Sequence, residues 1–175
     1  MDTCNLVIPD AALADEIRAY RQAFLACGDS MDGTGGLRRY GNPADWLDEN
    51  ARCTRWATTP AGWVPATQFA YLRERDGKIV GMIQVRHSLN DHLAQYAGHI
   101  GYSVRPDERR KGYAGAMLAG VLPHCRSLGL ARVMVTCNAD NEASRRTILK
   151  NGGVYAGTAH EPDEDADVEQ YWIVL

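Results

Sequence analysis

The spacing of apolar residues predicts two helices in the first third of the chain. From about residue 11 to 26, apolar side chains recur every three or four positions and so share one helical face; they are Leu13, Ile17, Tyr20 and Phe24. A second, shorter helix is predicted over 42–53, because Asn42 suits the N-cap and Pro43 the first helical position. The glycine-rich segment 28–36 between them predicts a flexible loop.

Apolar runs bounded by turn residues predict strands in the centre of the chain. Segments 68–74 and 78–89 flank Asp76-Gly77, a pair typical of a tight hairpin. Segment 98–104 is predicted as the next strand, and segment 4–8 is a candidate for an initial one.

Helical and strand patterns alternate in the second half. An apolar stripe at helical spacing predicts a helix from residue 114 that stops at Gly129, with a kink or an early end at Pro123. Segment 131–137 is predicted as a buried strand, and 141–153 as a short helix closed by two glycines.

The tail predicts two strands, over 153–160 and 168–175, joined by an acidic turn. The order of elements therefore predicts an α/β fold with a mixed sheet and helices on its faces. Since no repeat, low-complexity tract or linker-like change of composition interrupts the chain, we expect a single domain over residues 1–175.

Composition removes several classes of function. With 45% hydrophobic and 23% charged residues, the chain resembles ordinary soluble globular proteins. A net charge of −3 gives no general attraction to nucleic acid or to an anionic membrane. There is no apolar run near the roughly 20 residues that span a bilayer, and no signal peptide at the start. We therefore expect a cytoplasmic protein with no nucleic-acid or membrane partner.

Cysteine and histidine spacing argues against a metal site. The five cysteines are scattered and odd in number, and no two form C-x-x-C, so we expect neither disulfides nor zinc. No H-E-x-x-H or similar spacing links the five histidines either. Reduced thiols and no metal are the simplest interpretation.

The corner that follows strand 98–104 concentrates positive charge in an acidic chain. Its four cations stand against two anions; they are Arg105, Arg109, Arg110 and Lys111. The helix N-terminus that comes next presents unpaired N–H groups, which suit a phosphate, and Gly112 has no Cβ to obstruct a ligand. The P-loop and dinucleotide motifs are both missing. The corner is therefore either a phosphate site for another cofactor or a solvated basic loop.

At these residues the sequence resembles the GNAT superfamily of acetyl-CoA-dependent N-acetyltransferases. The phosphate loop of that family reads Q/R-x-x-G-x-G/A, and Arg109, Gly112 and Ala114 fill its fixed positions. Downstream, Asn141 and Ser144 match the N-x-x-A/S segment, which ends here at Gly152. The sequences "GHIGYSVRP", "CNADNEAS" and "YWIVL" are similar to a bacterial subgroup described only as predicted acetyltransferases.

The resemblance covers essentially the whole chain and implies a GNAT-like fold: a mixed, largely antiparallel twisted β-sheet with helices on both faces. It implies that the main chain of Val104 binds the pantetheine arm and polarises the thioester carbonyl, in a wedge where neighbouring strands splay apart. Main-chain N–H groups of residues 110–115 would hold the pyrophosphate. The cofactor-binding residues that it implies are Val104, Arg105, Arg109, Arg110, Lys111, Gly112, Tyr113, Ala114, Gly115, Asn141 and Ser144.

Transfer of acetyl to an amine needs a group that removes a proton, because an amine with a pKa of about 10.4 is mostly protonated at neutral pH. His99, expected on the strand of Val104 and near the usual position of the family's base, is the first candidate. His87 is the second, and Arg86 beside it could instead bind an acceptor carboxylate. The alternative for these histidines is a purely structural role.

The expected acid departs from the family pattern. Many members carry a tyrosine seven residues after the Asn141 position, where this chain has Ile148. Ser144, Tyr155, Tyr171 or solvent would have to protonate the leaving thiolate instead. Cys137 is interpreted as a buried core thiol, not as a covalent nucleophile. The predicted catalytic set is therefore His99, Val104 and Ser144.

The resemblance implies an enzyme that moves acetyl from acetyl-CoA to the amine of a small molecule or peptide, by direct transfer in a ternary complex. Two alternatives stay open: a GNAT-fold acyl-CoA-binding module with little turnover, and an anion-binding α/β protein unrelated to CoA. The N-terminal helices and loops would wall the acceptor pocket; of Trp46, Trp56 and Trp63 in this segment, one could line that pocket, and packing explains them equally well. The apolar last strand is a candidate edge for a homodimer.

Overall fold

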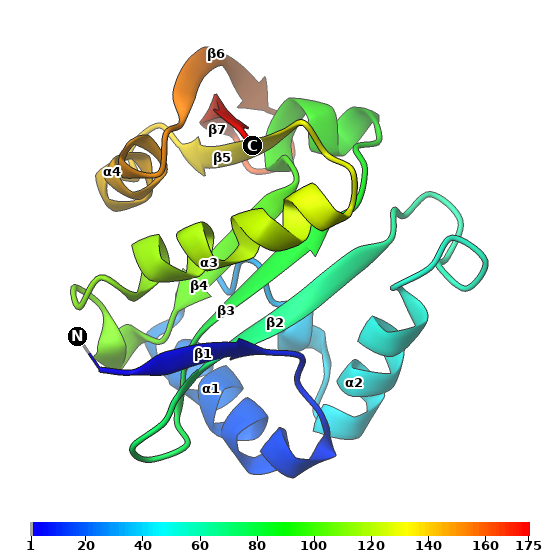
Figure 1. Ribbon diagram of the computed structural model, residues 1–175, viewed down its shortest axis with the longest axis vertical. Helices are drawn as coiled ribbons and strands as arrows, with labels where there is room; N and C mark the ends of the chain where they lie inside the picture. The colour runs from blue at the N-terminus through cyan, green and yellow to red at the C-terminus, as the bar shows by residue number, and fades with distance from the viewer. Residues whose placement is uncertain (1) are drawn as a thin grey trace.

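The computed structural model describes residues 2–175, in which seven strands form a sheet of order β1-β2-β3-β4-β5-β7-β6 (Figure 1). Neighbouring strands are antiparallel except β4 and β5, which are parallel. The strands are β1 (Cys4–Val7), β2 (Ala66–Arg73), β3 (Ile79–Arg86), β4 (Ile100–Val104), β5 (Arg132–Asn138), β6 (Val154–Glu161) and β7 (Ala166–Val174). The predicted mixed, largely antiparallel sheet is confirmed, including the initial strand.

Four α-helices cover both faces of the sheet (Figure 1). They are α1 (Ala14–Cys27), α2 (Pro43–Arg52), α3 (Tyr113–Ser127) and α4 (Glu142–Lys150). Short helical turns lie between these helices and strands: η1 (Ala11–Leu13), η2 (Leu37–Arg39), η3 (Leu93–Ala97) and η4 (Pro106–Glu108). Sequence patterning did not predict η3, which leads directly into β4.

Two apolar cores follow from this arrangement. On one face, α1 and α2 bury Tyr20, Phe24 and Trp46 against Met82 of β3. On the other face, the stripe of α3 packs on β3, β5 and β7, and Ile148 of α4 joins the same core. Burial of a large apolar side chain contributes about 1.5–3 kcal/mol, so these two cores hold the helices against both faces of the sheet and fix the position of β4 within it.

The structure confirms one of the local predictions made from the sequence and differs from two others. Asn42 caps α2, accepting from the N–H of Ala44 at 3.2 Å, as predicted. The early end predicted at Pro123 is wrong, because α3 continues to Ser127 and its apolar face stays packed on the sheet. Segment 28–36 packs against β4 instead of standing free: a Cβ on Gly33 would lie 2.0 Å from the carbonyl oxygen of Gly101.

Among the described residues, no helix combines the length and apolar character needed to cross a membrane. Within the same residues, no three His, Cys, Asp or Glu side chains are grouped as a metal site would require.

Candidate active site

The parallel strands β4 and β5 separate almost as soon as they meet. Their register contains one residue pair, Ile100 with Val135. Beyond it a cleft of about 780 Å³ opens, lined by Tyr102 and Val104 of β4 and by Cys137 of β5. The predicted splay of these two strands is therefore present.

Within residues 2–175, the edge of β4 that faces the cleft carries main-chain groups that pair with no other strand beyond Ile100. The N–H of Arg105 donates to Val80 of β3 at 3.0 Å. Because successive residues of a strand point their main-chain groups to opposite sides, the N–H and C=O groups of Tyr102 and Val104 face away from β3, toward the cleft. An extended ligand could bind there as an additional strand does.

The N-terminus of α3 closes the far end of the cleft. Gly112 is its N-cap with φ +85°, and Arg110 also has a positive φ, +64°. Within residues 2–175, the N–H groups of residues 110–115 have no recorded acceptor. Six consecutive main-chain donors are therefore available to an anion, supported by the positive end of the helix dipole.

The structure brings most of the predicted cofactor-binding residues to this one cleft. Those that line it are Val104, Arg109, Arg110, Gly112, Tyr113, Ala114, Gly115, Asn141 and Ser144. Arg105 and Lys111 do not line it, and neither does His99.

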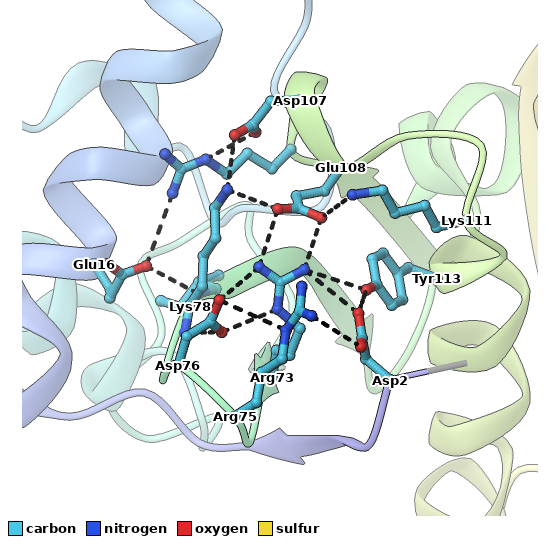
Figure 2. A network of polar contacts seen from close by, with 12 residues as sticks. Asp2, Glu16, Arg73, Arg75, Asp76, Lys78, Asp107, Glu108, Lys111 and Tyr113 are labelled. Carbon is cyan, nitrogen blue, oxygen red and sulfur yellow. Dashed lines mark hydrogen bonds and ion pairs between the residues drawn. The ribbon is translucent and has the colours of Figure 1, made fainter.

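Arg105 and Lys111 belong to a polar network behind the loop of residues 109–112, and Figure 2 labels Lys111 among its members. At its centre is Glu108, only 4% exposed, which accepts from Arg73 at 2.9 Å and from Lys78 and Lys111 at 2.7 Å each. Burial alone would raise the pKa of Glu108, but the hydrogen bonds from these three cations hold it well below its usual range. The network ties the loop to the β2–β3 hairpin.

Tyr113 extends this network to the start of the chain. Its ring is buried, and its hydroxyl donates to Asp2 at 2.8 Å (Figure 2). Asp2 also lies 3.6 Å from the guanidinium of Arg73. Tyr113 therefore points its side chain away from the cleft and contributes its main chain to it, while Arg105 and Lys111 support the loop from behind.

Arg109 lies over the end of β4. Its Nη1 pairs with Asp29 at 2.6 Å, its Nε donates to the carbonyl of Val104 at 3.3 Å, and its guanidinium stacks on Phe24. The hydrogen bond from Arg109 also lowers the pKa of Asp29. The first fixed position of the loop motif thus links the loop to the segment after α1.

The β5–α4 turn supplies hydroxyl groups to the cleft. Asn141 caps α4 by accepting from the N–H of Ser144 at 3.0 Å. The Ser144 hydroxyl lies 2.8 Å from that of Tyr102, and burial raises the pKa of Tyr102 to about 12. Cys137 lines the cleft too, but burial raises the pKa of its thiol to about 11, which keeps it neutral. Sequence reasoning missed Tyr102, whose only signal was its place two residues before Val104.

The expectation that His99 lies on the strand of Val104 is wrong, because β4 begins at Ile100. His99 is buried; its N–H donates to the carbonyl of Met134, and its Nδ1 accepts from the N–H of Met134 at 3.0 Å. Burial, together with the charge of Arg86, lowers its pKa to about 4. His87 is placed elsewhere as well, with its Nε2 2.8 Å from the Thr67 hydroxyl.

A second cavity, of about 550 Å³, lies on the α1–α2 side of the sheet. Loop 31–36, α2, Trp63 and the end of β3 contribute its walls. It shares four residues with the cleft, and we call them the shared mouth: Asp32, Gly33, Arg86 and His92. Trp63 lines the cavity as expected, whereas Trp46 is in the core and Trp56 is exposed. Sequence patterning missed Asp32 and His92, because nothing local marks a residue that reaches a site from a distant segment.

The comparisons with known proteins agree with this architecture. The family model described as an acetyltransferase (GNAT) domain matches residues 21–154, which is more than half of the chain. The chain is 31% identical over 109 residues to the uncharacterized N-acetyltransferase YoaA of Bacillus subtilis (strain 168); the match covers 59% of this chain and about 60% of the length of that relative.

Solved structures show the same fold at low sequence identity. The ribosomal-protein-S5-alanine acetyltransferase from Vibrio fischeri matches with a TM-score of 0.74 at 16% identity, covering 99% of this chain and 94% of that one. The microcin C7 self-immunity acetyltransferase MccE, in complex with acetyl-CoA and AMP, matches with a TM-score of 0.68 at 18% identity, covering 100% and 94%. With a family model matched across most of its sheet, the chain belongs to the GNAT acetyltransferases.

Proposed function

We propose that residues 1–175 form one N-acetyltransferase domain, which moves the acetyl group of acetyl-CoA to an amine by direct transfer in a ternary complex. The observation that carries this proposal is the cleft between β4 and β5, which ends at the unpaired N–H groups of residues 110–115. That combination fits a long ligand with an amide-containing arm at one end and a diphosphate at the other. Acetyl-CoA would supply the acetyl group as a thioester.

Main-chain groups would do most of the binding. The N–H groups of Val104 and Tyr102 and the C=O of Tyr102 face the cleft and would pair with the pantetheine arm, whereas the C=O of Val104 accepts from Arg109. A strand N–H directed at the thioester oxygen stabilises the charge that develops there, and such a donor typically contributes about 2.7–4 kcal/mol. The loop N–H groups, with Arg109 and Arg110 beside them, would hold the diphosphate.

Proton removal is assigned to the shared mouth and not to His99. His92 lies where the two cavities meet, with its Nε2 3.9 Å from a Glu161 carboxylate. Histidine is the side chain best suited to exchange a proton near neutral pH. We therefore place His92 as the group that accepts the proton of the acceptor amine, directly or through solvent.

The leaving thiolate would be protonated from the Ser144–Tyr102 pair of hydroxyls, which lies inside the cleft. Ile148, at the position of the tyrosine found in many family members, is fully buried in the α3-side core and takes no part. A covalent acetyl-cysteine route is disfavoured, because Cys137 is a neutral buried thiol. Direct transfer needs only the two substrates side by side.

Two measurements test the proposal. Calorimetry should detect binding of CoA, and a thiol-release assay with acetyl-CoA and an amine library should show release that depends on the amine. CoA at a hundredfold excess over its Kd should stabilise the fold by about 2.7 kcal/mol. Binding without thiol release for any amine would point to a binding module. Equal stabilisation by inorganic pyrophosphate would point to a general anion-binding protein.

A further inference from the structure

Arg86 differs from Arg109, which also lines the cleft and pairs with Asp29 at 2.6 Å. Three arginines outside the cleft lining contact two or more carboxylates each; they are Arg73, Arg105 and Arg145. Across residues 2–175, no carboxylate oxygen lies within 4.0 Å of the Arg86 guanidinium. Burial lowers the pKa of Arg86, and the charge of Asp32 acts in the opposite direction. Arg86 is half-buried, and a partly desolvated cation with no ion-pair partner is less well stabilised, so a role toward an anionic ligand would account for it.

The contacts of Arg86 direct part of its guanidinium toward the shared mouth. Its Nη1 donates to the carbonyls of Ala97 and Gly98, at 2.8 and 3.0 Å, where η3 ends. Its Nη2 lies 3.5 Å from the position that a Cβ on Gly101 would occupy, and Gly101 lines the cleft. A guanidinium has five N–H donors in a planar fork, so donors remain for a carboxylate that enters the mouth.

The anion that Arg86 would bind does not belong to the diphosphate of CoA. The N–H of Arg86 donates to the carbonyl of His99, while Val104 at the other end of β4 pairs with Gly81. Five residues of strand separate these points by about 16 Å, and the loop N–H groups lie beyond Val104. The anionic group must therefore come from the other substrate.

The mouth also carries a negative charge. Asp32 lines both cavities, and its carboxylate accepts from the Ser30 hydroxyl at 2.9 Å. Asp32 and Arg86 form no ion pair with each other in the described chain, so each is free to pair with a group of a ligand. A cation and an anion at one narrow place match a molecule whose ammonium and carboxylate are close together.

The remaining wall of the second cavity is polar. Gln84 of β3 has no side-chain hydrogen bond recorded within residues 2–175, and Asn50 of α2 uses only its Nδ2, on the carbonyl of Trp46. Glu49 lines the same wall. A volume of about 550 Å³ is within the range of small-molecule sites.

From these observations we infer that the acceptor is a free α-amino acid with a polar side chain: Arg86 binds its carboxylate, Asp32 lies near its ammonium group, and its side chain extends into the second cavity. This inference rests on the proposed acetyl transfer. In the reaction the amine nitrogen forms the amide bond, the carbon–sulfur bond of the thioester breaks, and the amine proton leaves through the mouth while the thiol of CoA is released.

The test compares L-amino acids with their α-carboxamides in the thiol-release assay. A carboxamide has the more easily deprotonated amine, so intrinsic reactivity favours it, and a preference for the acid reports recognition. We expect the acids to have a kcat/KM roughly 10- to 100-fold higher, mostly through KM, as for a charge-assisted hydrogen bond. Arg86→Gln should remove this preference, and Arg86→Lys should keep part of it.

Arg39→Gln is the matched control, because Arg39 lines the same cavity but is exposed and stacks on Trp63. It should leave the preference for acids intact, and all three variants should bind CoA with unchanged affinity. Carboxamides turned over as well as acids by the wild type would overturn the inference while leaving acetyl transfer standing. An equal loss for both acceptor types in Arg86→Gln would also overturn it. Failure to bind CoA would instead remove the proposed function itself.

Discussion

The proposed cofactor cleft and the proposed acceptor cavity meet at the shared mouth, but they are built in different ways. The cleft uses main-chain groups of β4 and of residues 110–115, which are neighbours in the sequence. The cavity uses side chains from loop 31–36, α2, Trp63 and β3, which are far apart in the sequence. Main-chain recognition tolerates many side chains and leaves a short motif, whereas side-chain recognition can diverge freely. The cleft can therefore stay constant while the lining of the second cavity changes, and with it the substrate that the site accepts.

The largest expected effect concerns the support of the cleft. Replacing Glu108→Gln removes the carboxylate that accepts from Arg73, Lys78 and Lys111, so we expect the free energy of unfolding to fall by about 3 kcal/mol. Thermal unfolding should show a decrease in Tm of about 6–12 °C. The Kd of CoA should rise as the loop loosens, while the KM of the acceptor at saturating acetyl-CoA should not change.

Asp107→Asn is the control for that variant. Asp107 contacts Lys78 and Arg105 but its side chain is 54% exposed, so its loss should cost less than about 1 kcal/mol. Similar losses for both variants would contradict a special role for the buried carboxylate.

The second prediction separates the two regions by function. Gly112→Val places a branched side chain at φ +85° and beside the unpaired N–H groups. We expect the Kd of CoA, measured by calorimetry, to rise by about 30-fold or more, at about 1.4 kcal/mol per tenfold. Gly129→Val has nearly the same backbone strain, φ +81°, with no atom within 4 Å of its Cβ. If it weakens CoA binding as much, the effect of Gly112 is strain alone.

The third prediction concerns the mouth. His92→Gln removes the proposed proton acceptor from an exposed position where water can partly replace it, so kcat should fall by about tenfold. Pre-steady-state and steady-state thiol release should both show this decrease, with an unchanged Kd for CoA and an unchanged Tm. An unaltered kcat would assign proton removal to solvent.

The smallest effect is a change of stability with pH that arises at His99, beside the junction of β4 and β5. Burial lowers the pKa of His99 from 6.5 to about 4, so between these values the unfolded chain binds more protons than the folded one. Stability is then fully present above pH 6.5 and is lost as pH falls toward 4. From pH 7.5 to 5.5 we expect a loss of about 1 kcal/mol from this group.

His99→Gln supplies the comparison for that pH series. His87 and His124 also have lowered pKa values through burial and act in the same direction, so only the difference between wild type and variant isolates His99. A variant with the same pH dependence as the wild type would show that His99 does not titrate in this range.

The contrast between a cleft built from sequence neighbours and a cavity built from distant segments also explains how much of the molecule could be predicted from the sequence. The order of elements, the hairpin at Asp76-Gly77, the cap at Asn42 and the corner at Gly112 depend on near neighbours, and local spacing predicted them. The continuity of α3 through Pro123 depends on packing against the sheet, which no local rule contains. Arg86, Asp32 and His92 come together only through the fold, so their common location required coordinates. The surroundings of His99 could not be predicted either, because its hydrogen bonds to Met134 join segments 35 residues apart.

The single residue pair between Ile100 and Val135 has a mechanical consequence. In residues 2–175 it is the one strand pair between a four-stranded and a three-stranded part of the sheet, and the hydrogen bonds between His99 and Met134 lie beside it. Those parts therefore resist separation mainly through these few contacts, α3 and the core beneath it. A pantetheine arm hydrogen-bonded to the cleft-facing edge of β4 would add contacts that hold the two parts of the sheet together. Deuterium uptake at the amides of Tyr102 and Val104 would then report two things at once: whether the substrate is bound, and how firmly the two parts of the sheet are held together.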